Sequence, residues 1–176
     1  MLQGVLGERF ALKVHHEMRV LPGADLVMAR RDGKVGPRLQ PATEADADCT
    51  PGTSPPDFTN DMPPCSQGVG VGRFRARGIT MQRLADTLAF TFGVSPFVYD
   101  KTNLTGAFNI DLFEFRPDGL PDSPPPDLPA NAPPWPSLDT PSIYTALQEQ
   151  LGLKLEFLKE PADVIVIDQV KRPTPD

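Results

Sequence analysis

The chain has 176 residues, which is enough for one domain or for two small lobes. Its formal net charge is −6 at pH 7, and an acidic chain lacks the positive field that draws proteins to phosphate backbones, which argues against nucleic acid as a partner. No apolar stretch approaches the length of a membrane-spanning helix, which needs about 20 residues. Met1 leads directly into an amphipathic segment without a signal peptide, so a complete chain is expected in the cytoplasm.

The pattern of residues 1–40 predicts a helix followed by a two-stranded hairpin, and these elements together form a half-lobe. Alternation around Leu12–Val14 is typical of a strand, and Asp25–Arg30 supplies its antiparallel partner. A two-stranded hairpin is marginal in water by itself. We therefore expect this half-lobe to dock onto the later sheet, with self-association through residues 1–40 as the alternative. The apolar residues of the expected helix are Leu2, Val5, Leu6 and Phe10.

Two proline-rich stretches divide the chain, which carries 22 prolines in all. Residues 41–68 form a linker that contains both cysteines, Cys49 and Cys65, and residues 117–141 form an insertion in the C-terminal lobe. Such stretches bury too little apolar surface to fold alone. In a reducing compartment the two thiols stay unpaired, whereas in an oxidising one they close a loop and stabilise the fold by roughly 3 kcal/mol.

The C-terminal lobe, residues 69–176, begins with a strand that has one basic face. The run Gly68–Gly72 lacks the lysine of a phosphate-binding loop, so we interpret it as a flexible entry into this strand. Thr80 is a natural cap for an amphipathic helix that starts at Met81, and Gly93 suits the left-handed residue after it. Three apolar residues of the strand, Phe74, Ala76 and Gly78, alternate with three arginines, Arg73, Arg75 and Arg77.

The rest of this lobe predicts a second strand–helix–strand unit. A turn at Asp100–Gly106 precedes a strand at Ala107–Phe115, in which Phe108, Ile110 and Leu112 face one way. Thr140 and Pro141 start a helix that Gly152 ends. Two short strands follow, Leu153–Phe157 and Val164–Ile167, separated by a turn at Lys159–Ala162. The β-branched run of the last strand suggests burial on both faces.

The order of elements in this lobe, β-α-β-β-α-β-β, predicts an α+β fold. We expect helices packed on a small, mostly antiparallel sheet, built from repeated helix–strand–strand units that proline-rich linkers separate.

The sequence offers no catalytic, cofactor-binding or metal-binding pattern that we accept. His15 and His16 are adjacent and point to opposite faces of a strand, so they cannot bind one metal together. Asp111 and Glu114 stand at an odd separation on a strand and are expected to face opposite ways, which does not make an acid–base pair. We therefore expect a protein that is not an enzyme and that carries no cofactor.

Four residues are the candidates for a surface interaction. Arg73, Arg75 and Arg77 share one face of a strand, although an edge strand also carries such charge merely to prevent aggregation. Trp135, in the run PPWP, either binds a domain that recognises polyproline segments or holds the linker against the sheet.

Three segments of the chain resemble an uncharacterised family that is abundant in Acidobacteria and related soil bacteria, whose members are often called soil-associated proteins. The segments are MLQGVLGERFALKVHHE, DKTNLTGAFNIDLFEF and PSIYTALQEQLGLKLEFLKEPADVIVIDQVKRP. The chain departs from the family pattern at Asn103, where glycine is usual, and at Ala107, where a basic residue is usual. Paired cysteines in the proline-rich middle also resemble the family.

The resemblance implies a location outside the cytoplasm. Family members usually begin upstream of the position of Met1 with a signal sequence, so the chain looks like the family without its beginning. Some relatives appear joined to membrane-embedded antibiotic-sensor modules that resemble zinc peptidases. The order of elements is also similar, more loosely, to the short N-terminal domain of secretins and TonB-dependent receptors, which mediates protein contacts in the periplasm.

We therefore expect a non-enzymatic interaction or sensor domain, periplasmic or extracellular, with a protein partner in the cell envelope. The alternative is a small ligand-binding or hydrolase-like enzyme with a site between its lobes.

Overall fold

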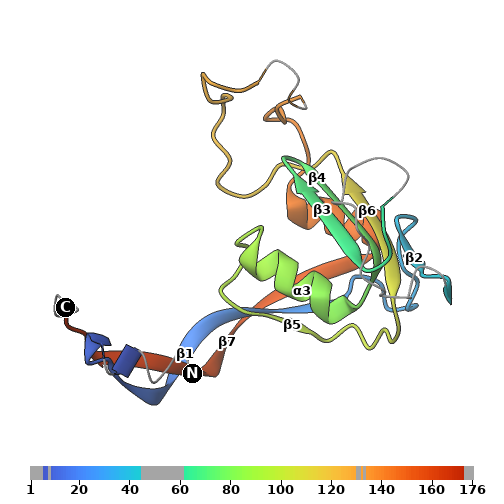
Figure 1. The fold of residues 1–176 in the computed structure, drawn as a ribbon. Coiled ribbons are helices and arrows are strands. Elements are labelled where there is room, and N and C mark those ends of the chain that lie inside the picture. The colour runs from blue at the N-terminus through green and yellow to red at the C-terminus, as the bar shows by residue number, and fades with distance from the viewer. Residues whose placement is uncertain (1–5, 8, 45–61, 130–131, 133, 173–176) are drawn as a thin grey trace. The chain divides into compact units, whose positions relative to one another are not determined.

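The computed structural model describes residues 6–7, 9–44, 62–129, 132 and 134–172. The chain divides into two compact units, of which unit 1 combines Met1–Pro22 with Lys159–Asp176 and unit 2 comprises Gly23–Leu158. The described elements in chain order are β1 (Lys13–Met28), β2 (Leu39–Pro41), β3 (Ser66–Gly70), β4 (Arg73–Ile79), α3 (Met81–Phe90), β5 (Val98–Asp100), β6 (Phe108–Phe113), α4 (Ile143–Ala146), the π-helical turn η1 (Leu147–Leu151) and β7 (Leu153–Gln169) (Figure 1).

The expected α+β fold, with helices packed on a small antiparallel sheet, is wrong. Strands make up 40% and helices 16% of the described residues, which form two sheets and include only two short helices. Most of the difference comes from β1 and β7, because each is one long strand where the sequence predicted two short elements.

β7 continues through the predicted turn because its proline does not disturb the sheet. β7 is an edge strand in the order β5-β1-β7, and proline is tolerated where its missing N–H points away from the neighbouring strand. Pro161 therefore lies inside β7 and does not end it. The expected burial of Val164–Ile167 on both faces is also wrong, since Ile165 is 64% exposed and Ile167 62% exposed.

A four-stranded antiparallel sheet of unit 2, in the order β2-β6-β4-β3, carries most of the core on its inner face. Its alternation matches the prediction, because Phe74 and Ala76 of β4 are buried together with Phe108, Ile110 and Leu112 of β6. Gly68–Gly72 differs from the prediction: Ser66–Gly70 is strand β3, which pairs with β4, and Gly72, with φ of +69°, lies in the connection between them.

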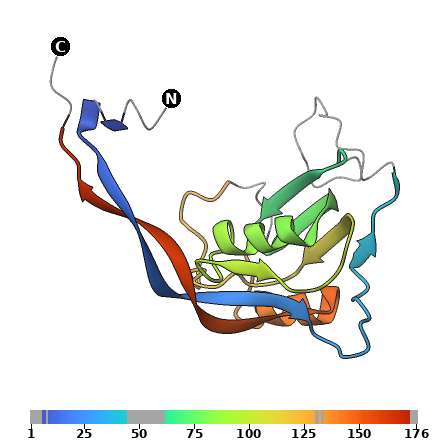
Figure 2. The ribbon, with the colours of Figure 1, turned by 90° about the horizontal axis from the view of Figure 1, so that it is seen from below.

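The second sheet of unit 2 joins β1 to β5 in parallel, with Ala24 opposite Val98 and Leu26 opposite Asp100. The helix α3 contacts β5 and reaches β3 through a hydrogen bond of 3.1 Å from Thr87 Oγ1 to Gln67 Oε1 (Figures 1 and 2). Both sheets and both helices therefore share one hydrophobic core within unit 2.

The local signals for the two helices are largely confirmed. Thr80 accepts a hydrogen bond from the Arg83 N–H at 3.2 Å, as a cap of α3 should. The second helix starts two residues later than expected, because Ser142 and not Thr140 accepts the capping hydrogen bond, from Thr145 N–H at 3.2 Å. Gly152 has φ of +70° and ends η1, as predicted.

Unit 1 contains a two-stranded ribbon formed by the first part of β1 and the last part of β7. The N–H of Lys171 donates to Phe10 O at 2.7 Å, which joins the residue shortly before β1 to the residue shortly after β7. Two exposed pairs cross the ribbon: His15 Nδ1 lies 2.8 Å from Asp168 Oδ1, and His16 Nδ1 lies 2.9 Å from Asp163 Oδ2. Of the helix expected in this region, Leu2 and Val5 lie outside the described residues.

Replacing Leu151 by alanine should lower the free energy of unfolding by about 2–5 kcal/mol, because the side chain is fully buried and its removal leaves a cavity. The matched control is Leu138→Ala, where the side chain is 67% exposed and the loss should stay below about 0.5 kcal/mol. Urea denaturation followed by circular dichroism measures both. Equal midpoints for the two variants would contradict this packing of η1.

Candidate functional site

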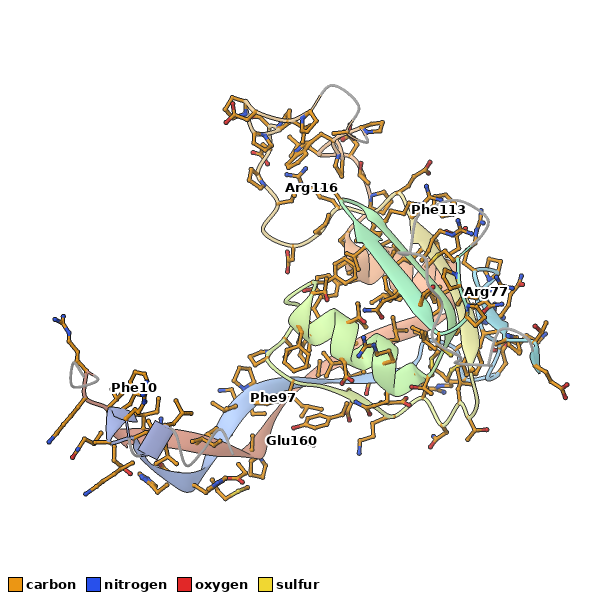
Figure 3. The ribbon with its side chains drawn as sticks, viewed as in Figure 1. Phe10, Arg77, Phe97, Phe113, Arg116 and Glu160 are labelled. Carbon is orange, nitrogen blue, oxygen red and sulfur yellow. The ribbon has the colours of Figure 1, made fainter. Side chains whose placement is uncertain are left out.

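The three arginines of β4 lie together on the outer face of the four-stranded sheet. Arg73 is exposed and Arg75 and Arg77 are half-buried, while the residues between them are buried. Figure 3 shows Arg77 and Phe113 on the side of the sheet that faces away from α3. The alternative that these charges protect a sheet edge is wrong, because β4 lies between β6 and β3 inside the sheet.

β6 and the residue before β2 complete this cationic face. Asp111 stands opposite Arg75 and Phe113 stands opposite Arg73 in the register of the two strands. The Asp111 carboxylate lies 3.6 Å from Arg75 Nε and 3.5 Å from Arg38 Nη1, so two guanidinium groups share it. The Arg38 guanidinium also lies 4.4 Å above the centre of the Phe113 ring, a cation–π contact.

Two cavities open on this face and adjoin each other, since Arg38 and Asp111 line both. The smaller has a volume of about 320 Å³ and is lined mainly by polar side chains, among them Arg38, Gln40, Arg75, Arg77 and Asn109. The larger, of about 980 Å³, lies between Arg73 and Phe113 on the sheet and Pro134–Pro136 of the proline-rich insertion. We call the two together the groove.

Gln150 of η1 fixes the position of both ends of the Arg38–Phe113 contact. Its side-chain Oε1 accepts from the Phe113 N–H at 3.2 Å, and its Nε2 donates to Phe113 O at 2.7 Å. Its own backbone oxygen accepts from the Arg38 N–H at 2.9 Å. The side-chain amide therefore makes the two backbone hydrogen bonds that a neighbouring strand would otherwise make with Phe113 at the end of β6. Single π-helical turns often occur at functional sites, and this one lies beside the groove.

Arg116 holds the proline-rich insertion in one conformation. Its guanidinium donates to the backbone oxygens of Pro136 at 2.9 Å, Leu120 at 2.7 Å and Pro121 at 3.0 Å, and its side chain is only 14% exposed (Figure 3). Trp135 Nε1 donates to Pro121 O at 3.1 Å, so its indole N–H is bonded within the insertion and not to the sheet. The insertion therefore presents Trp135 as a fixed wall of the groove.

A second contact ties the insertion to α4. The Tyr144 hydroxyl donates to Asp118 Oδ2 at 2.8 Å. Burial, with the neighbouring Asp118 carboxylate adding to it, raises the pKa of Tyr144 to about 12. The phenol therefore keeps the proton that it donates throughout the physiological pH range.

The carboxylates considered as an acid–base pair lie differently from our expectation. Asp111 and Glu114 both line the larger cavity, because Glu114 has φ of +52° and interrupts the strand alternation, which also buries Phe115. Asp100 forms the predicted turn by accepting from the Thr102 N–H at 2.9 Å. The described part of the chain contains no group of three residues arranged to hold a metal ion.

The cysteine prediction stays a prediction. Cys65 lies directly before β3 and has φ of +55°, while Cys49 lies outside the described residues.

Sequence reasoning missed Arg38, Gln150 and Arg116. Arg38 follows Gly36 and Pro37, which carry no strand signal, and Gln150 bonds a residue that is 37 positions away in the chain. For Arg116 a signal existed, because a single arginine between a strand and a proline-rich stretch is well placed to bind that stretch's free carbonyl groups.

The fold and the groove together define a β-rich protein with a cationic surface on one sheet. The chain belongs to the family described as "Protein of unknown function (DUF3738)", whose model matches residues 1–170. The expected membership in an uncharacterised family is confirmed at this level. No curated protein and no solved structure matches the chain. Within the described residues, no helix is both long and apolar enough to cross a membrane.

Replacing Gln150 by glutamate should lower the free energy of unfolding by about 1–3 kcal/mol at neutral pH, because the carboxylate cannot donate to Phe113 O and its negative charge faces the partial negative charge of that oxygen. Below about pH 4 the protonated carboxyl regains a donor, so the deficit should shrink. Gln148→Glu is the matched control, since Gln148 is exposed on the same turn. Equal, pH-independent losses in the two variants, measured by chemical denaturation, would disprove the role of the amide.

Proposed function

We propose that the protein is a non-catalytic binding module that holds an acidic partner protein on the cationic face of its four-stranded sheet. The observation that carries the proposal is the alignment of Arg73, Arg75 and Arg77 on one sheet face, beside Arg38 and in the wall of a groove. Guanidinium groups bind carboxylates through planar paired hydrogen bonds, so such a row suits an acidic surface.

The chemistry of the groove supports binding more than catalysis. Arginine side chains keep their protons far above neutral pH and therefore do not exchange protons with a substrate. The carboxylate between them, Asp111, is engaged by two guanidinium groups. The fixed positions of Arg38 and Phe113, which Gln150 sets, lower the entropy that binding would cost.

The acidic net charge of the chain makes the test specific. A protein of charge −6 should be repelled by immobilised poly-L-glutamate unless a local cationic face attracts it. We expect binding at low salt that weakens as salt rises, and a loss of at least about tenfold in affinity for the double variant Arg73→Glu, Arg77→Glu. Arg83→Glu, an exposed arginine of α3, is the matched control. No binding, or equal weakening by the control, would refute the proposal.

The proposed location outside the cytoplasm rests on the family resemblance and on the two cysteines. If Cys49 and Cys65 form a disulfide in the oxidising compartment, thiol counting in denatured, non-reduced protein from that compartment should find no free thiol. Reduced protein, which should show both thiols, is the control. Two free thiols in the secreted protein would count against both the disulfide and the location.

A further inference from the structure

We propose that the ribbon of unit 1 is a surface for self-association, in which its apolar face packs on the same face of a second copy of the chain. This inference goes beyond the proposed function, because it concerns unit 1 alone and involves none of the arginines of β4.

The two faces of the ribbon carry different side chains. β1 and β7 lie side by side there (Figure 2), and successive side chains of a strand point to opposite faces. His16 Nδ1 lies 2.9 Å from Asp163 Oδ2, so these two residues share a face with every second residue of their own strands. The apolar residues at those positions are Val14, Met18, Val20, Ile165 and Ile167. We call these five, together with His16 and Asp163, the apolar face.

The apolar face is open to solvent within the described part of the chain. The exposed fraction of its five apolar side chains runs from 45% for Val14 to 68% for Val20. A two-stranded ribbon is marginal in water unless one of its faces packs against another element. Neighbouring apolar side chains that stay exposed mark interaction sites. The other face of β1 is polar and consists of Lys13, His15, Glu17 and Arg19.

The polar pair within the apolar face favours a second copy as the partner. A carboxylate only accepts hydrogen bonds, so His16 Nδ1 donates to Asp163 and leaves its own Nε2 and the second carboxylate oxygen for other partners. A two-fold contact brings the same patch of both copies together. It therefore offers a carboxylate to each His16 ring and an imidazole to each Asp163 carboxylate, so the face is complementary to itself.

The distribution of charge also favours self-association through unit 1. Residues 1–22 and 159–176 contain six basic and six acidic residues, so this unit has no net charge, and the whole excess of −6 belongs to residues 23–158. Two copies of an acidic protein repel each other in general. Their neutral units are the parts that can approach without this repulsion.

Other partners fit the apolar face less well. Faces that bind membranes combine Trp, Phe or Leu with basic residues, whereas this one has no aromatic side chain and carries Asp163, which anionic lipids repel. A strand added beyond β7, the edge strand, would lie beside Ile165 and Ile167 but leave Met18 and Val20 of β1 exposed. Packing of face on face covers the residues of both strands.

The size of the apolar face predicts a weak dimer. Val14 and Val20 are six residues apart, which corresponds to about 20 Å along the strand. A contact of this length on two strands is smaller than the interfaces of stable dimers. We expect a dissociation constant in the micromolar range or weaker.

Sedimentation equilibrium of the full chain over a range of concentrations measures this dimer. The double variant Ile165→Thr, Ile167→Thr keeps β-branched side chains but makes the face polar, so the dissociation constant should rise at least about tenfold. Phe90→Gln is the matched control, because Phe90 is 82% exposed on α3 of unit 2 and its removal should leave the dimer unchanged.

An exchange of charges tests whether the face recognises itself. His16→Asp gives a face with two carboxylates, and Asp163→Lys gives a face with no carboxylate, so each variant alone should dimerise about fivefold or more weakly than the natural chain. A mixture of the two should form a heterodimer that recovers the lost affinity. His15→Asp mixed with Asp168→Lys is the control, because this pair lies on the opposite face and should have no effect on the dimer. Circular dichroism verifies that each variant is folded.

The outcomes separate this proposal from its alternatives. A chain that stays monomeric at millimolar concentration would overturn it, and so would equal weakening by Phe90→Gln or a mixture that recovers no affinity. A monomer that floats with vesicles of phosphatidylcholine and phosphatidylglycerol would overturn it in favour of a lipid surface. None of these results changes the expected binding to poly-L-glutamate, so the proposed function stands or fails separately.

Discussion

The groove depends on a close approach of two backbones, at Gly36 and Gly152. The Gly36 N–H donates to Leu151 O at 2.8 Å, and a Cβ atom on either glycine would lie 2.7 Å from the backbone nitrogen of the other. Any larger residue at either position would force the two segments apart. This contact places Arg38 beside Gln150, and from there the chain enters β2 against β6.

The same junction explains how an acidic protein keeps a cationic surface. Net charge sets the far field, whereas the four arginines on the outer face of the sheet set the charge close to β4, within about one Debye length of roughly 10 Å. The carboxylates of Glu114, Asp139 and Glu149 line the larger cavity and limit this positive field to the face of the sheet. Asp111 offsets part of this charge by its position between Arg38 and Arg75. The Arg77 guanidinium is held separately, because it donates to Met62 O at 2.8 Å.

The two-stranded ribbon of unit 1 has its register set by its own cross-strand pairs and by the continuity of its strands. β1 and β7 belong to the same three-stranded sheet, in which β1 also pairs with β5. Ala24 and Leu26 of β1 take part in this pairing and are buried. A slip by one residue would turn these two side chains out of the core, so the register of β1 is firmly specified there. Gly23–Met28, the second half of β1, belongs to unit 2 and pairs there with β5, while the docking expected for residues 1–40 as a whole stays a prediction.

Local patterns in the sequence correctly predict several elements of the fold. Alternation identified the buried residues of β4 and β6 and the shared face of Arg73, Arg75 and Arg77, and the Thr80 cap and Gly152 bounded helices correctly. Local patterns do not predict that β1 and β7 are single long strands, because the pairing of strands far apart in the chain overrides the turn preference of Pro161. The groove also depends on contacts between residues far apart in the chain. The Gln150–Phe113 and Arg38–Asp111 contacts join residues 37 and 73 positions apart, and no local pattern encodes a contact between such distant side chains.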